Sequence, residues 1–125
     1  MPSASKHESK AKSNRRVLEK LDIETAADWA VVVAFYTAVH LIEHLRALDG
    51  QHSISHLDRN EYVKGNHREI HADFHTLYSL SLVARYSANV DFYKAIESDV
   101  VKEKVLGKSL STIDQYVSAF ISNRN

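Results

Sequence analysis

The sequence predicts an all-α protein, an up-and-down four-helix bundle with one additional short helix. Its 125 residues are enough for a single domain with one core. Only three Gly and one Pro occur, and the Pro is at position 2, so the chain lacks the turn residues that a many-stranded protein needs. Long apolar stretches at helical spacing, joined by short polar connections, therefore favour a helical bundle.

The N-terminal segment is polar and basic. Residues 1–20 contain six Lys and Arg but only two Glu, and the apolar side chains that can dock appear late, at Val17, Leu18 and Leu21. We expect residues 1–10 to be flexible and residues 11–125 to form one helical domain. A solvated, frayed helix accounts for this charge run, and a segment that contacts phosphate groups is the alternative.

The next helix, predicted over residues 25–48, is the core element. Thr25 and Asp28 fit a capping box at its start, and Gly50 follows its end. Between residues 29 and 42 nearly every side chain is apolar on all sides of the helix. This pattern is expected for a helix that lies in the middle of a bundle.

A short helix and a long helix are predicted to follow. Ser55 and Asp58 are suited to cap a short helix that ends near Gly65. In residues 67–86 the apolar side chains recur at helical spacing, so this segment is expected to pack one face against the central helix: Ile70, Phe74, Leu77 and Ala84, with Leu80 beside them.

The C-terminal helix is predicted after a break near Asn89. Ser98 or Asp99 is expected to cap it, and Gly107 is expected to bend it. Its later half, from residue 113 onward, is strongly amphipathic.

Composition also bears on the cellular compartment. The chain has no Cys, which excludes a disulfide framework and a thiolate metal site and suits a reducing compartment. The longest apolar run, residues 29–36, is too short to cross a bilayer, and the first residues lack the apolar stretch of a signal peptide. We therefore expect a cytoplasmic protein without membrane contact.

Four segments between residues 26 and 95 form a family-like pattern. They read AFYTAVH at 34–40, HSISH at 52–56, RNEYVKG at 59–65, and LY at 77–78 with ARY at 84–86. This pattern resembles the HEPN superfamily, in which one subgroup has Tyr-x-Ala-x-His on the central helix, a His-rich link, a Phe/Tyr-Val-Lys-x-Gly step and an ending similar to Arg-x-x-Ala-Asp-Tyr. The ARY segment lacks the acidic residue often found before that Tyr.

The resemblance implies both a fold and a class of function. HEPN proteins are four- or five-helix bundles that usually dimerise, and they include ribonuclease toxins, RNA-processing modules and partners of small nucleotidyltransferases. It therefore implies a homodimer that binds RNA, a nucleotide or another protein, in a setting such as a toxin-antitoxin or defence system, with a nucleotidyltransferase as one partner. No cofactor is expected.

A metal-independent ribonuclease is the enzymatic alternative. The ribonuclease branch uses an Arg followed four to six residues later by a His, with two subunits completing the site. Arg46 and His52 have this spacing but lie at the end of the central helix, and Arg59 is followed by Lys64 where a His would fit, with His67 one position beyond. We therefore expect a binding protein in the first place, with these four Arg and His residues as catalytic candidates.

A cluster of His residues suggests a third function. Seven of the eight His fall within residues 40–75, and the segment HLIEH at 40–44 matches an inverted zinc-protease pattern without the larger domain that such an enzyme needs. A simpler metal site would use His44, His71 and His75 with Asp73 or Glu43. Without a metal, His40 is expected to be hydrogen-bonded in the bundle, His52 and His56 to be solvated or capping, and protonation below about pH 6.5 to weaken a dimer seam.

Aromatic and cationic residues supply the candidates for a ligand site. Tyr side chains near Arg residues provide flat surfaces and positive charge for a base or nucleotide, although core packing explains many such Tyr residues equally well. The candidate ligand-binding residues are Tyr36, His40, Tyr62, Tyr78, Arg85 and Tyr86.

Overall fold

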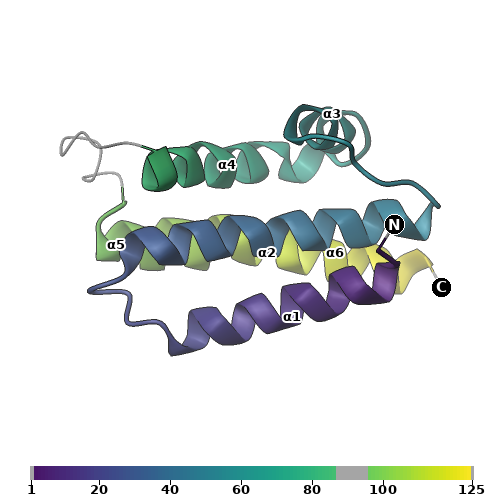
Figure 1. Ribbon diagram of the computed structural model, residues 1–125. Helices are drawn as coiled ribbons and strands as arrows, with labels where there is room; N and C mark the ends of the chain where they lie inside the picture. The colour runs from purple at the N-terminus through teal and green to yellow at the C-terminus, as the bar shows by residue number, and fades with distance from the viewer. Residues whose placement is uncertain (1, 87–95, 125) are drawn as a thin grey trace.

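The described part of the protein is a bundle of helices. The computed structural model describes residues 2–86 and 96–124, and these contain helices and no strands, which confirms the predicted all-α fold. Successive long helices run in opposite directions along the bundle, and the short helix α3 lies across one end (Figure 1). They are α1 (Ala4–Lys20), α2 (Ala27–Leu48), α3 (His56–Asn66), the 3-10 turn η1 (Arg68–Ile70), α4 (His71–Tyr86), α5 (Ser98–Val100), the π-helix η3 (Val101–Leu110) and α6 (Ser111–Arg124).

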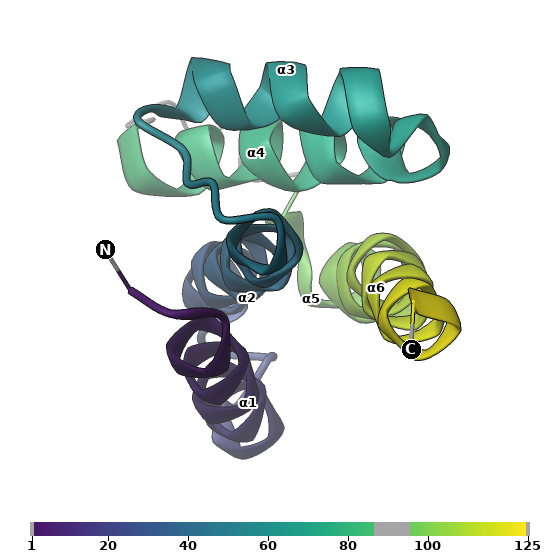
Figure 2. The ribbon, with the colours of Figure 1, turned by 90° about the vertical axis from the view of Figure 1, so that its right-hand side faces the viewer.

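Helix α2 occupies the centre of the bundle. It packs against α1, α4, η3 and α6. In Figure 2, α1, α2 and α6 are seen nearly end-on while α3 and α4 are seen from the side, so α4 crosses α2 obliquely. Phe35 and Ile42 of α2 are fully buried with Phe74 of α4 and Val117 of α6. This burial explains why α2 is apolar on nearly every side, as the sequence predicted.

The apolar composition of α2 is also compatible with a membrane-spanning helix. By length and composition it is the one helix among the described residues that is apolar enough to cross a membrane. Most of its apolar stretch is buried inside the bundle, however. The burial of its side chains therefore accounts for its composition.

Helix α1 begins within the segment that was expected to be flexible. The Ser3 hydroxyl accepts a hydrogen bond from the Lys6 backbone N–H at 3.3 Å, which caps the first turn. One turn later, His7 and Ala11 are buried against α2. The structure is therefore helical from Ala4, with a cap and two buried side chains, in a segment whose charge run indicated fraying.

The start of α2 differs from the predicted capping box. Ala26, whose side chain offers no hydrogen bond, is the N-cap residue, and the Thr25 hydroxyl instead donates to the backbone oxygen of Asp22 at 3.3 Å. The Thr25 cap is therefore wrong, because that hydroxyl closes the preceding turn. The predicted end is confirmed: α2 stops at Leu48, and Gly50 adopts a φ of +74° that suits glycine.

The start of α3 confirms the predicted cap. The Ser55 hydroxyl accepts from the Asp58 backbone N–H at 3.0 Å. The helix continues through Gly65 to Asn66, slightly beyond the predicted end, and His67 caps it. Asp58 is in the first turn, where a carboxylate interacts favourably with the helix dipole.

The C-terminal helix contains a π-helical stretch that the sequence did not predict. Neither Ser98 nor Asp99 caps it, because the N-cap residue is Glu97 and the Ser98 hydroxyl donates to Glu24 at 3.0 Å. Gly107 lies in η3, where a β-carbon would be 2.9 Å from the backbone oxygen of Lys102. The glycine thus permits a locally wide helix at the position where a bend was expected. The predicted break near residue 89 lies outside the described residues.

Candidate functional site

One face of α2 is left partly uncovered between α1 and α4. We call it the open face of α2, and it consists of Trp29, Val32, Val33, Tyr36 and His40, which recur at helical spacing. Trp29 is 63% exposed although it belongs to the core helix. The open face is therefore the part of the central helix on which another molecule can bind.

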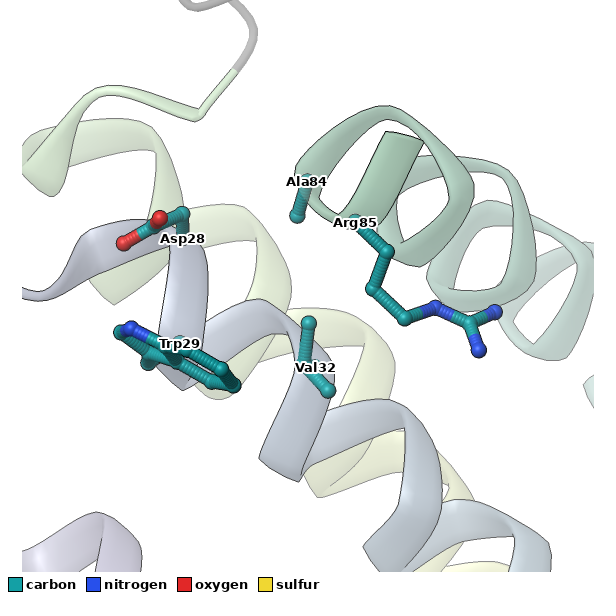
Figure 3. A pocket seen from close by; sticks show the side chains of 5 residues that line it. All are labelled: Asp28, Trp29, Val32, Ala84 and Arg85. Carbon is teal, nitrogen blue, oxygen red and sulfur yellow. The ribbon is translucent and has the colours of Figure 1, made fainter. Parts of the chain in front are cut away.

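Two grooves flank the open face. The α1–α2 groove has a volume of about 290 Å³ and is lined by the open face together with Lys10 and Asn14 of α1. The α2–α4 groove is smaller, about 160 Å³, and is lined by Asp28, Trp29, Val32, Ala84 and Arg85 (Figure 3). Since Trp29 and Val32 line both, the two grooves form one continuous surface along α2.

Arg85 is held in a fixed position beside this surface. Its Nη1 donates to the Tyr36 hydroxyl at 2.8 Å, and its Nε donates to the Ser81 backbone oxygen at 3.2 Å. The guanidinium carbon also lies 5.1 Å from the ring centre of Tyr86. Figure 3 shows the guanidinium turned away from the Asp28 carboxylate. Within residues 2–86 and 96–124, Arg85 forms no ion pair with a carboxylate.

His56 and Tyr78 extend the site from α3 and α4. The His56 ring lies 5.6 Å from that of Tyr78 and 5.7 Å from that of the buried Phe35. Its Nδ1 accepts from Arg59 Nη1 at 2.9 Å, so its proton is on Nε2. Burial, followed by the charges of Arg59 and Arg85, lowers the pKa of His56 and favours the neutral ring.

Arg59, a catalytic candidate, forms an ion pair with a buried carboxylate. Its Nε donates to Glu43 at 2.9 Å, and the other Glu43 oxygen accepts from the Ser53 backbone N–H at 3.2 Å. Burial would raise the pKa of Glu43, but hydrogen bonds from Ser53 and Arg59 outweigh it and hold the pKa below its usual value. This carboxylate therefore remains charged and fixes both α3 and the preceding loop to α2.

Arg46, the other candidate arginine, is similarly engaged. Its Nη1 donates to Asp58 at 3.2 Å and to the Ser53 hydroxyl at 3.0 Å, and its guanidinium carbon lies 4.7 Å from the ring centre of Tyr62. Tyr62 therefore belongs to this cluster and not to the open face of α2. Arg46 and the nearby His52 do not form a hydrogen bond within the described residues.

His67 is buried between two Tyr hydroxyls. Its Nε2 lies 3.2 Å from the Tyr62 oxygen, and its Nδ1 lies 2.9 Å from the Tyr116 oxygen. Burial lowers the pKa of His67 and raises that of Tyr116 to about 12, the latter with a contribution from Glu69. The ring thus joins α3 to α6 with both nitrogens engaged.

His40 contacts a residue that the sequence analysis did not select. Its Nδ1 lies 3.0 Å from Nδ1 of His7 in α1, so one ring donates and the other accepts. Burial, then the charge of His7, lowers the pKa of His40 to about 4. His7 was missed because residues 1–10 were expected to be flexible. The Ser3 cap, with His7 and Ala11 one turn apart, is the local signal that would have found it.

The candidate metal ligands lie on different sides of the bundle. His44 is buried with its Nδ1 3.7 Å from Glu8 of α1, whereas His71 and His75 are neighbours on α4 and Asp73 accepts from Ser109 of η3. Among the described residues no three His or carboxylate side chains are grouped closely enough to hold a metal ion. This set therefore does not form the metal site that the His cluster suggested.

No family model, curated protein or solved structure matches this chain.

Proposed function

We propose that this chain is a homodimeric, non-catalytic helical bundle that binds RNA or a nucleotide at the open face of α2. The observation that carries the proposal is Arg85, whose guanidinium is positioned by Tyr36 and Ser81 beside exposed aromatic side chains. Aromatic rings that stack on bases, combined with cations that contact phosphates, are the usual elements of such sites. The resemblance to HEPN proteins implies the same class of ligand.

The state of the other arginines favours binding over catalysis. Arg46 and Arg59 are paired with Asp58 and Glu43, and His67 is enclosed by two Tyr hydroxyls. A ribonuclease site needs a cation free to contact the scissile phosphate and a base within reach of the attacking group. These side chains have other partners within their own subunit, which supports a ligand-binding role for the protein.

The homodimer is part of the same proposal. Ile54 and Leu57, just before and within the first turn of α3, are 87% and 70% exposed. Large apolar side chains with this exposure, three residues apart in the sequence, are suited to a protein interface. Sedimentation of the wild type should give a dimer, and I54E/L57E should shift it to a monomer. A wild-type chain that stays monomeric at high concentration would remove this part of the proposal.

Binding can be measured by the fluorescence anisotropy of a labelled single-stranded RNA, with unlabelled nucleotide as competitor. R85A should weaken binding about tenfold or more, the loss expected for a charge-assisted hydrogen bond of roughly 1.5–3 kcal/mol. R68A, which removes an exposed Arg from η1, is the matched control and should bind as the wild type does. Circular dichroism checks that R85A folds.

Two results would overturn the proposal. One is a wild-type protein that binds neither RNA nor nucleotide at low salt, where phosphate contacts are strongest. The other is cleavage of the RNA in the presence of a chelator, with loss of cleavage in R59A or H67A, which would instead establish the ribonuclease alternative.

A further inference from the structure

The α1–α2 groove is lined by aromatic, cationic and neutral polar side chains, and no carboxylate among the described residues lines it. Its lining consists of Lys10, Asn14, Trp29, Val32, Val33, Tyr36 and His40. Lys6 lies one turn before Lys10 on the same side of α1, and both side chains are exposed. The groove therefore presents positive charge along one edge and an apolar, aromatic floor.

Trp29 is the most unusual member of this lining. It is exposed on a helix whose other large side chains are mostly buried, and it stands between the α1–α2 and α2–α4 grooves. Tyr36 lies two turns further along the same face, about 10 Å away at 1.5 Å per residue. Two aromatic rings spaced along a groove provide separate platforms for successive bases.

The charges favour a polyanion as the occupant. Lys10 lines one side of α2 and Arg85 lies on the other. In the described ranges neither forms an ion pair. A protein surface that covered them would have to supply carboxylates or leave buried charges unpaired, which is costly. A nucleic acid strand supplies a negative phosphate at every nucleotide.

We infer that the α1–α2 groove binds single-stranded RNA, with Trp29 as a base-stacking platform and Lys10 as a phosphate contact. This inference rests on the proposed function and identifies its ligand as an extended strand in place of a mononucleotide. A base stacks on the exposed indole, and the strand runs along α2 towards Tyr36 and His40. Duplex RNA keeps its bases stacked within the helix and offers none to Trp29.

The indole itself reports on binding. Trp29 is the only Trp in the chain, so its intrinsic fluorescence monitors this groove directly. Titration with oligouridylate should quench that fluorescence, and duplex RNA of equal length should have a much smaller effect. W29A should weaken single-strand binding about tenfold, within the range of one base-aromatic stack, while W29F retains most of the affinity. V17A, which alters an exposed apolar residue of α1, is the control.

Lys10 is tested by the salt dependence of binding. K10A should reduce the slope of log affinity against log salt by about 0.7, the value for one phosphate contact of a single strand. K104A, at an exposed position of η3, should leave the slope unchanged.

Three results would overturn the inference. If the wild type binds RNA without quenching of Trp29, and W29A binds equally well while R85A loses affinity, the α1–α2 groove is not the site and the proposed function stands at the α2–α4 groove. If W29A converts a dimer to a monomer, a second copy of the chain covers this face. If the wild type binds no RNA at all, the inference and the proposed function fail together.

Discussion

Acidification should destabilise the protein through the contact between His7 and His40. The two Nδ1 atoms are 3.0 Å apart, and one ring can accept the shared hydrogen bond only while it is neutral. His40 is half-buried, and the charges of His7, Lys10 and Arg59 oppose its protonation while that of Glu43 favours it. When both rings are protonated, both Nδ1 atoms carry a hydrogen, so the shared hydrogen bond is replaced by repulsion between α1 and α2.

The size of the effect follows from the pKa of His40. This pKa falls from 6.5 in the unfolded chain to about 4 in the fold. Below about pH 6.5 the unfolded chain binds the proton more readily, so stability falls as the pH falls. For these two values the loss attributable to His40 between pH 7 and pH 5 is about 2 kcal/mol, and it levels off below about pH 4. Carboxylates remain mostly charged between pH 7 and pH 5, so the change in stability over this interval comes mainly from the His residues.

Urea unfolding followed by circular dichroism at pH 7 and pH 5 measures this loss. H40Q keeps a group that can hydrogen-bond to His7 but cannot titrate, so it should lose about 2 kcal/mol less than the wild type over the same interval. H75Q, at an exposed position of α4, should behave as the wild type does. Equal losses in H40Q and the wild type would refute this account of the contact.

Three further changes test the fold. S55A removes the N-cap of α3 and should lower the free energy of unfolding by about 1 kcal/mol in urea titrations. G107A places a β-carbon 2.9 Å from a backbone oxygen in η3 and should lower stability by about 1–3 kcal/mol, and an unchanged melting temperature would contradict the close approach. E43L leaves Arg59 without its buried partner and should cost about 3 kcal/mol in the same titrations, most of which E43L/R59M should restore.

The fold was predictable where its signals are local. The apolar stretch in α2, the Ser55 cap and the stop at Gly50 each depend on residues within a few positions of one another. The helical start of α1 was not predictable from its charge, because it brings His7 against α2, a contact between residues far apart in the sequence. The Thr25 cap failed because its hydroxyl donates to the backbone oxygen of Asp22 in the preceding turn and does not accept from a backbone N–H at the start of α2.

The candidate site was predictable only in part. Tyr36, Tyr86 and Arg85 do lie together, but Tyr62 packs against Arg46 on another side of α2. Trp29 was assigned to the core because its neighbours in sequence are apolar, and only the arrangement of α1 and α4 leaves it exposed.

The three arginines show why spacing alone does not define a site. Arg46, Arg59 and Arg85 have the same side chain and each lies near a Tyr or a His in sequence. Glu43, three residues before Arg46 on α2, pairs instead with Arg59 of α3, and a carboxylate of α3 pairs with Arg46. These exchanged partners lock α2 to α3 and neutralise two cations. Whether an arginine is available for a ligand therefore depends on which carboxylates the tertiary structure brings close to it. Among the described residues no carboxylate pairs with Arg85, which donates to the Tyr36 hydroxyl.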